Sequence, residues 1–506
     1  MTVEDLLKRF DGKLVYVSGK KDAVIDSVEY DSRKVSMKSL FVAVKGLVSD
    51  GHDYIRPLDE KGLACVIVSS ERASEFSDLK CSVISADDTR AALSFVSAYF
   101  FGEVTLSIPV IGITGTNGKT STTYMLEALF KKSGYNPGVI GTVAYRWNGN
   151  EIPAPNTTPE SRDLHKLFYD MKKDGVDCVI MEVSSHGLAL GRVNDIAFQG
   201  AVFTNLTRDH LDYHKTFEEY FEAKKILFRI LDRSSRKNKF ACVNHDDEYG
   251  RKILRSKGDY SYPLFSFGLS NEADFFPVEN SLITSISSVE YYVKHGDSVF
   301  HVNLPMGGKF SFYNSLAAFS AASAFGLNGK TAAEGFALIK NVPGRFERVD
   351  ADCNFSVIVD YAHTNDAMEK LLSSAQELNP SKLITVFGCG GDRDKTKRPL
   401  MGEVAGKYSD TAIVTSDNPR TENPESIISD ILEGMDEYKD RTVVEIDREK
   451  AIRYAISIAE KDSVIVIAGK GHEDYQIIGT EKHHFDDREI AKKYMELSAS
   501  LSGAVK

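Results

Sequence analysis

Residues 112–123, GITGTNGKTSTT, constrain the fold of this chain more than any other stretch. They follow the apolar run SIPVI and lead into YMLEALFKKSGY, where Leu126, Leu129 and Phe130 recur at helical spacing. Gly134 is typical of a helix C-terminus. The pattern predicts a buried strand, a glycine-rich turn and a helix, an order in which backbone N–H groups can surround phosphate oxygens.

The turn also carries the side chains that phosphate binding uses. Lys119 supplies a positive charge and Thr120 a hydroxyl for Mg²⁺. The predicted nucleotide-binding residues of the turn are Gly115, Thr116, Asn117, Gly118, Lys119, Thr120 and Ser121. The strict G-x4-G-K-[ST] spacing requires a glycine at position 113, where Ile113 stands, so a glycine- and threonine-rich turn without a ligand is the alternative.

Length and breaker residues predict an α/β protein of three domains. A chain of 506 residues is longer than a single hydrophobic core normally supports. We therefore expect a small α/β domain over 1–105, a parallel-sheet domain over 106–343 and a third domain over 344–506. The Pro-Gly break in NVPGRFERV marks the second boundary. Four apolar runs of the third domain each end in a polar loop, and such loops share one edge of a parallel sheet: FSVIVDYAH, LITVFGCGGDRD, TAIVTSDNPR and SVIVIAGKGHED.

Charge and cysteine usage exclude several classes of function. The chain has 62 Lys and Arg against 73 Asp and Glu, a net charge of −11, which argues against a nucleic-acid or membrane-surface binder. Six cysteines without a C-x-x-C pair indicate reduced thiols in a cytosolic protein. Because no run approaches about 18 apolar residues, and the first residues are charged, we expect neither membrane insertion nor export.

Two acidic or basic side chains follow strands beside the turn. Glu182 ends the run CVIMEV, and His210 follows the next run in FTNLTRDHLDYH. If both strands lie parallel to the strand before the turn, both side chains reach its edge, where a carboxylate can bind the metal of a bound nucleotide. The alternatives are a carboxylate that caps its own turn for Glu182 and a hydrogen-bonded loop residue for His210.

Lys224 lies in the apolar stripe of a predicted helix, whereas Lys225 does not. In TFEEYFEAKKILFRIL the stripe includes Phe217, Tyr220, Phe221, Leu227, Phe228 and Leu231. A lysine on a buried face has a lowered pKa, and its neutral amine can react with CO2 to give a carbamate that binds Mg²⁺ through oxygen. The simpler alternative is a lysine that extends past a partly buried face to solvent.

Taken in order, the motifs resemble the Mur ligase family over essentially the whole chain. They are DSR…LFVAVKG…DGHDYI, GITGTNGKT, NTTPES, EVSSHGL, TNLTRDHLDYH, DYAHT, GCGGDRD…KRP, DNPR and GKGHEDYQ. The glycine-rich turn, with Ile113 where the strict motif requires glycine, is that family's own form of the phosphate loop. The resemblance implies an N-terminal UDP-binding domain, a central P-loop ATPase-like domain and a C-terminal Rossmann-like domain.

The resemblance also implies roles for individual residues. Tyr30, Ser32 and the turn over 47–49 would hold the uridine diphosphate, and Thr157, Thr158, Ser184 and Arg192 the muramoyl dipeptide. Thr120 and Glu182 would bind one Mg²⁺, and His210 with carbamylated Lys224 a second; Asn314, Arg345 and Asp360 would contact ATP. The incoming amino acid would bind at Arg393, Asp417, Asn418, Pro419, Arg420, Gly469 and Glu473.

Three positions carry further expectations. Leu190 replaces a glutamine and Asn365 a proline that relatives commonly carry, which puts a substrate contact and a rigid turn in doubt. Arg420 in SDNPR offers a planar fork for a second carboxylate, which favours meso-diaminopimelate over L-lysine or L-ornithine as the incoming amine. The basic residues of GCGGDRDKTKRP surround a glycine turn, and a solvated loop is the simpler interpretation; the alternative is a functional loop, because SDNPR and GKGHE lie at equivalent strand ends. These residues are Arg393, Lys395, Lys397 and Arg398.

The implied reaction is ATP-dependent addition of meso-diaminopimelate to UDP-N-acetylmuramoyl-L-alanyl-D-glutamate through an acyl phosphate, by a cytoplasmic monomer. Two other classes stay open on the residues alone: a P-loop kinase or nucleotide switch, and a nucleotide-sugar binding protein without catalysis. The DSR…LFVAVKG segment argues against the related synthetase that extends folate with glutamate.

Overall fold

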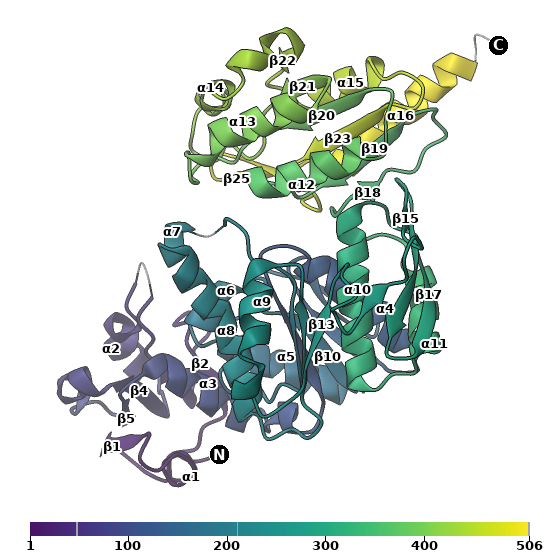
Figure 1. The fold of residues 1–506 in the computed structure, drawn as a ribbon. Helices are drawn as coiled ribbons and strands as arrows, with labels where there is room; N and C mark the ends of the chain where they lie inside the picture. The colour runs from purple at the N-terminus through teal and green to yellow at the C-terminus, as the bar shows by residue number, and fades with distance from the viewer. Residues whose placement is uncertain (47–48, 210, 504–506) are drawn as a thin grey trace.

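The computed structural model describes residues 1–46, 49–209 and 211–503 (Figure 1). Helices and largely parallel sheets alternate along the chain, so the α/β class expected from the sequence is confirmed. The N-terminal strands and the C-terminal strands lie on different sides of the central part of the chain (Figure 1). The domain limits at 105 and 343 remain predictions.

The first sheet has five strands in the order β1-β5-β4-β3-β2, and only β1 is antiparallel to its neighbour. The strands are β1 (Val15–Ser18), β2 (Ser27–Glu29), β3 (Ser39–Val42), β4 (Cys65–Ser69) and β5 (Ser82–Ala86). Their helices are α1 (Val3–Arg9), α2 (Ile55–Asp59) and α3 (Thr89–Phe100), with short 3₁₀ turns η1 (Gly51–Tyr54), η2 (Ser70–Phe76) and η3 (Val104–Leu106). Separate apolar clusters cover its two faces.

The central sheet has eight strands in the order β13-β12-β11-β6-β10-β7-β8-β9. They are β6 (Val110–Thr114), β7 (Pro137–Ile140), β8 (Ala144–Trp147), β9 (Asn150–Pro153), β10 (Cys178–Glu182), β11 (Gly200–Phe203), β12 (Phe240–Asn244) and β13 (Leu264–Phe267). β10 and β11 both pair with β6 in parallel, as the sequence predicts for the strands that carry Glu182 and precede His210. Their carboxyl ends therefore meet at the glycine-rich turn.

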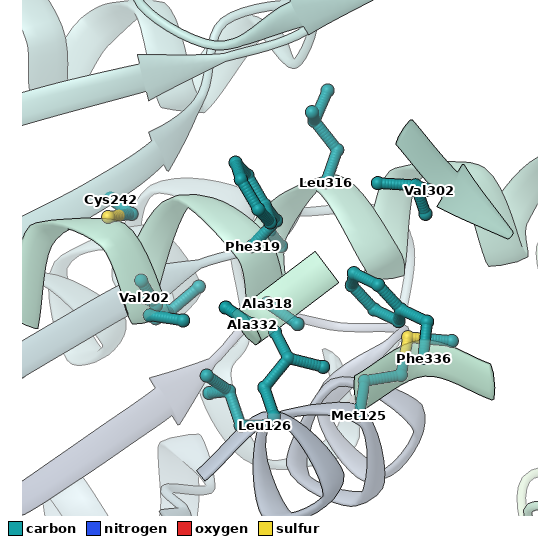
Figure 2. Packing of buried hydrophobic residues seen from close by; sticks show 14 of the residues in the cluster. Met125, Leu126, Val202, Cys242, Val302, Leu316, Ala318, Phe319, Ala332 and Phe336 are labelled. Atoms are coloured by element: carbon teal, nitrogen blue, oxygen red, sulfur yellow. The ribbon is translucent and has the colours of Figure 1, made fainter. Parts of the chain in front are cut away.

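The helices of this part are α4 (Lys119–Lys132), α5 (Ser161–Lys173), α6 (Ser185–Ala189), α7 (Leu211–His214), α8 (Phe217–Arg233), α9 (Glu248–Arg255), α10 (Lys309–Phe325) and α11 (Gly329–Gly335), with η4 (Lys257–Asp259) and η5 (Phe336–Leu338). Figure 2 shows the core in which Leu126 of α4, Val202 of β11 and Phe319 of α10 meet. A second cluster, which includes residues of α5 and α8, covers the opposite face. Burial on both faces explains the continuous apolar runs of these strands.

A small antiparallel sheet was not predicted from the sequence. It comprises β14 (Phe276–Pro277), β15 (Ile283–Thr284), β16 (Val289–His295) and β17 (Ser298–Leu304). In β16, Val289, Tyr291 and Val293 are buried while the residues between them are exposed, the period-two pattern of a strand with one solvated face.

The last large sheet has the order β18-β19-β23-β20-β21-β22, parallel except at β18. Its strands are β18 (Glu347–Arg348), β19 (Ser356–Asp360), β20 (Leu383–Phe387), β21 (Thr411–Val414), β22 (Thr442–Val444) and β23 (Val464–Ala468). Its helices are α12 (Asn365–Gln376), α13 (Lys397–Tyr408), α14 (Pro424–Leu432), α15 (Arg448–Ser457) and α16 (Asp487–Gly503), with η6 (Asp436–Arg441) and the hairpin β24 (Tyr475–Ile478) and β25 (Glu481–His484). The four polar loops follow β19, β20, β21 and β23, as predicted.

Two further expectations concern cysteines and membrane spans. All six cysteines are free thiols, and five of them are buried. Within the described residues, every helix falls short of the length and apolar character that a membrane crossing requires.

Candidate active site

The glycine-rich turn lies between β6 and α4, as predicted, and two of its glycines adopt conformations that other residues avoid. Gly115 has φ of 151° and Gly118 has φ of 88°. A Cβ atom at Gly118 would lie 2.3 Å from Asn314 Oδ1, and one at Gly115 would lie 1.9 Å from Thr204 Oγ1. The turn is therefore packed so closely against α10 and the end of β11 that only glycine fits at these positions.

Lys119 begins α4 and folds back onto the turn. Its Nζ donates to the carbonyl oxygens of Gly115 and Thr116, each at 2.9 Å. Burial lowers the pKa of Lys119, and the negative charges of Glu182 and Asp209 oppose that shift. The ammonium is thus held at the N-terminus of α4, where the partial positive charge of the helix also favours an anion.

Thr120 and Glu182 form a buried cluster of oxygen atoms. Thr120 Oγ1 donates to Glu182 Oε2 at 3.0 Å, and Thr142 donates to Glu182 through its N–H at 2.8 Å and its hydroxyl at 2.9 Å. Glu182 is 1% exposed. Its carboxylate therefore contacts a neighbouring loop and does not cap its own turn, and its hard oxygen donors fit Mg²⁺.

Lys224 is buried in α8, whereas Lys225 is half-buried and pairs with Glu222 at 2.8 Å. The Lys224 side chain is 1% exposed, and its Nζ lies 4.4 Å from the centre of the Tyr220 ring. Burial lowers the pKa of Lys224 well below its usual value, with Lys119 adding to the shift. Burial of this kind excludes the alternative in which the ammonium extends to solvent.

The predicted metal ligands are only partly placed. His210 lies outside the described residues. Among the described residues, no group of three or more His, Cys, Asp or Glu side chains is arranged to hold a metal ion. Protein ligation of a second ion at Lys224 therefore depends on its predicted carbamate.

The residues predicted to hold the muramoyl dipeptide gather around the end of β10. Thr158 Oγ1 donates to the Glu182 carbonyl at 3.1 Å and accepts from Ser184 N–H at 2.9 Å. Ser184 Oγ caps α6, and Arg192 donates to the Thr158 carbonyl at 3.0 Å. Thr157 Oγ1 lies 3.1 Å from Thr142 Oγ1. The hydroxyl of Thr158 thus orients the loop that carries the other members of this set.

The predicted uridine diphosphate site is less complete. The Tyr30 hydroxyl donates to Asp163 Oδ2 of α5 at 2.7 Å, and burial raises the pKa of this phenol. Ser32 is half-buried in the turn after β2. Residues 47 and 48 of the predicted turn lie outside the described residues. Tyr30 therefore joins the first sheet to the central part of the chain.

One cavity, of about 590 Å³, is lined by the predicted ATP-binding residues except Gly115. Residues 116–121 and Glu182 line one side, and Arg345 and Asp360 from the C-terminal part line another. Burial raises the pKa of Asp360, and Arg345 opposes the shift. Asn117 Nδ2 donates to Asp366 Oδ2 at 3.3 Å across the same junction. Asn314 also lines this cavity, so the nucleotide set predicted from three distant segments is brought together.

A second cavity, of about 630 Å³, contains most of the predicted amino-acid-binding residues. It is lined by Arg393, Asp417, Asn418, Arg420, Gly469 and Glu473. Burial raises the pKa of Glu473, and the negative charge of Asp417 adds to the shift. Asn418 Nδ2 donates to Glu473 Oε2 at 2.8 Å. Pro419 lies in the same loop but does not line the described cavity wall.

The two cavities share a wall, which sequence reasoning did not assign. Asp209, Tyr361, His363 and Thr364 line both cavities. His363 Nδ1 lies 2.9 Å from the Tyr361 carbonyl, and since a carbonyl only accepts, Nδ1 carries a proton and donates to it. The DYAHT motif contains His363, but spacing along the sequence did not place this residue between two cavities.

Two departures from the family pattern have local consequences. Leu190 ends α6 and is half-buried. Asn365 is the first residue of α12, where Thr364 caps the helix by accepting from Ala367 N–H at 3.3 Å. A helix can begin here without proline because the first N–H groups have no partner within the helix.

Known proteins resemble this chain along its length. Residues 24–100 match the description "Mur ligase family, catalytic domain", residues 113–322 match "Mur ligase middle domain", and residues 344–471 match "Mur ligase, glutamate ligase domain". The chain belongs to the Mur ligase family. The family recognised from the sequence motifs is thereby confirmed.

Several Mur ligases are similar over nearly the full length. The Clostridium acetobutylicum protein named UDP-N-acetylmuramoyl-L-alanyl-D-glutamate–2,6-diaminopimelate ligase 1 is 44% identical over 494 residues, 97% of this chain and 99% of that protein. The Clostridioides difficile ligase of the same name, without a number, is 44% identical over 493 residues, with the same coverage.

Solved structures agree with the fold. A structure of a UDP-N-acetylmuramoyl-L-alanyl-D-glutamate–2,6-diaminopimelate ligase, 31% identical, superposes with a TM-score of 0.68 over 94% of this chain and 95% of that one. MurF from Acinetobacter baumannii, 19% identical, has a TM-score of 0.67 over 98% of each chain and shows likeness of fold alone.

Proposed function

We propose that this Mur ligase uses ATP to join meso-diaminopimelate to the D-glutamyl γ-carboxylate of UDP-N-acetylmuramoyl-L-alanyl-D-glutamate, a step of peptidoglycan precursor synthesis. The observation that carries the proposal is the shared wall of the two cavities. One cavity holds the phosphate-binding turn, and the other presents both acidic and basic side chains. An acyl phosphate made in the first can therefore meet an amine bound in the second.

The reaction consists of two displacements. The γ-carboxylate oxygen attacks the γ-phosphorus of ATP, so that the acyl phosphate forms and ADP leaves. The neutral amine then attacks the acyl carbon, and the tetrahedral intermediate loses phosphate and a proton to give the amide. Lys119 and the N–H groups of the turn would offset the negative charge that accumulates in both steps.

Thr120 and Glu182 would hold one Mg²⁺, and His210 with carbamylated Lys224 the other. The buried oxygen cluster at Glu182 and the low pKa of Lys224 support this assignment. Bound there, Mg²⁺ would neutralise charge on the phosphates.

The second cavity would select the amine through charge. Asp417 and Glu473 would take the ammonium group that does not react, while Arg420, assisted by Arg393, would pair with the carboxylate that distinguishes diaminopimelate from lysine. Carboxylate recognition by a planar arginine is bidentate and directional, so an amine without that group would leave the remaining N–H donors of Arg420 without a carboxylate partner.

An amino-acid screen tests the proposal. With UDP-N-acetylmuramoyl-L-alanyl-D-glutamate, ATP and Mg²⁺, product mass should show meso-diaminopimelate preferred to L-lysine or L-ornithine by well over tenfold. Arg420→Ala should lose most of this preference, about 2–5 kcal/mol, because a carboxylate would be left unpaired. Equal wild-type rates with lysine would overturn the diaminopimelate assignment but not the ligase assignment.

The same experiment separates the rival classes. A kinase would leave the phosphoryl group on its product, and a binding protein would release no ADP on addition of amine. A ligase needs all three substrates and yields an amide with free phosphate. We place the ligase in the cytoplasm, since its co-substrate is ATP and its cysteines are free thiols, and we propose that it acts as a monomer.

A further inference from the structure

Arg398 is fully buried at the start of α13, which excludes for this residue the simpler interpretation of a solvated basic loop. Its Nη2 donates to Glu422 Oε1 at 2.9 Å and its Nη1 to Glu422 Oε2 at 3.1 Å, a two-pronged ion pair. Nη1 also donates to Asp430 Oδ2 at 2.8 Å, and Nη2 to the Gly390 carbonyl at 3.3 Å. One side chain therefore joins the loop after β20 to the loop after β21.

The two loops interlock beyond this ion pair. Gly391 N–H donates to the Asn418 carbonyl at 2.9 Å, and Asp392 N–H donates to Glu422 Oε1 at 2.5 Å. The Thr421 hydroxyl donates to Asp392 at 2.8 Å. A Cβ atom at Gly391 would lie 1.9 Å from the Pro419 carbonyl oxygen, so the loops are as close as two backbones allow.

This interlock determines where the Arg420 guanidinium lies. Arg420 has φ of 51°, a left-handed conformation that is uncommon for a residue with a side chain. Its Nη1 donates to the Gly391 carbonyl at 2.6 Å, at the edge of the second cavity. Because a guanidinium is planar, a hydrogen bond at one nitrogen restricts the direction of its remaining N–H donors.

The loop of Arg420 is held from the other side as well. Ile477 N–H donates to Asn418 Oδ1 at 2.8 Å, and Arg420 N–H donates to the Ile477 carbonyl at 3.1 Å. The hairpin thus fixes the backbone of Arg420, while the Gly391 carbonyl fixes its side chain. Removal of the Arg398–Glu422 pair would release only the second constraint.

We propose that Arg398 and Glu422 are positioning residues that set the preference for an amine with a second carboxylate, by fixing the carbonyl that orients Arg420. The inference rests on the proposed function and adds to it residues that do not contact the amino acid. It predicts that selectivity depends on a buried ion pair behind the cavity.

The test compares variants of two basic partners of Glu422, Arg398 and Lys395. Lys395 also pairs with Glu422, at 3.2 Å, but is 66% exposed, so Lys395→Met is a matched control for Arg398→Lys. In the full-length enzyme, Arg398→Lys and Glu422→Gln should lower the ratio of kcat/KM for diaminopimelate over lysine at least tenfold, chiefly through KM for diaminopimelate. KM for ATP and for the UDP substrate should change less than twofold. Lys395→Met should keep the wild-type ratio.

A second measurement separates positioning from general stability. In an Arg420→Ala background, Arg398→Lys should change the selectivity ratio no further, because the group it orients is gone. A full tenfold loss in that background, or an unchanged ratio in folded Arg398→Lys and Glu422→Gln, overturns the inference.

If Arg398→Lys does not fold, Thr421→Val decides, because it removes only the hydroxyl contacts to Asp392. We expect a smaller loss of selectivity in the same direction, and an unchanged ratio overturns the inference. A wild-type enzyme that does not discriminate between the amines would instead overturn the diaminopimelate assignment, and this inference with it.

Discussion

Lys224 shows how a single buried side chain can acquire a new chemistry. The residue is 1% exposed, and burial and Lys119 together favour the neutral amine. A neutral amine is nucleophilic toward CO2, and the product carries oxygen in place of a positive charge. The pKa shift therefore supports the carbamate, which remains a proposal.

We predict that Lys224→Ala lowers ligation about 100-fold or more because a metal ligand is lost. A small carboxylate in excess should partly restore the variant and leave the wild type unchanged, measured as amide product by mass. Lys225→Ala, which alters the neighbouring half-buried residue, is the control and should stay near wild type. Near-normal turnover by Lys224→Ala, or no carbamate signal in ¹³C NMR with labelled CO2, would contradict the assignment.

At the scale of single residues, the sequence predicted burial for Lys224 but did not predict the partners of Arg398. Helical spacing placed Lys224 on a buried face, and the structure agrees. For Arg398 a solvated loop was the simpler of two interpretations, and its complete burial excludes that one. The partners of Arg398, Glu422 and Asp430, lie 24 and 32 residues further along the chain, and local spacing contains no information on such pairing.

Among the elements, the glycine-rich turn gives a controlled comparison of two glycines. Gly118 and Gly134 both have φ of 88°. A Cβ atom at Gly118 would lie 2.3 Å from Asn314 Oδ1, whereas one at Gly134 would meet nothing within 4 Å. Alanine would thus strain the backbone at both sites, but its Cβ atom would collide with a neighbour only at position 118.

We predict that Gly118→Ala lowers kcat/KM for ATP at least tenfold because Asn314 and the turn must move apart. Gly134→Ala should keep that value within about twofold while losing about 1 kcal/mol of stability from strain alone. ATP-dependent phosphate release and urea unfolding measure the two quantities. Equal loss of ATP turnover in both variants would show that strain, and not the contact with Asn314, is responsible.

Secondary structure was predictable where one period dominates. The strand before the turn, the helix after it and the parallel neighbours of β6 all follow from apolar runs and helical stripes. The antiparallel sheet of β16 and β17 was missed, although the sequence has Val289, Tyr291 and Val293 at every second position, the side chains that the structure buries. Short β14 and β15, two residues each, are too brief for periodicity to detect.

For the whole molecule, the arrangement of the cavities could not follow from spacing. The predicted nucleotide set and amino-acid set each converge, but that they share a wall at His363 depends on how the C-terminal sheet sits against the central one. The motifs named the family, and so implied that the sites meet. Contacts such as Asn117 to Asp366, 249 residues apart, required the structure.

Stability should also depend on a histidine remote from both cavities. His165 in α5 is 2% exposed, packs edge-on against Phe168, and its Nε2 has no hydrogen-bond partner among the described residues. Burial lowers the pKa of His165 to about 4, against 6.5 for an ordinary histidine. Between these values the unfolded chain binds the proton and the folded chain does not, so the free energy of unfolding falls as pH falls from about 6.5 to 4.

We predict that His165→Leu removes this dependence. At pH 7 the imidazole is largely neutral in both the folded and the unfolded chain. Near pH 4 the wild type should have lost about 3 kcal/mol of its free energy of unfolding through this residue, a loss that the variant does not suffer. Urea unfolding of both proteins at several pH values, read as the difference in slope, cancels the carboxylates common to both. His301→Leu, at an imidazole 45% exposed and paired with Glu290, is the control and should not flatten the slope. Parallel curves for wild type and His165→Leu would mean that the imidazole is hydrated or protonated in the folded enzyme, and that its burial does not limit stability in acid.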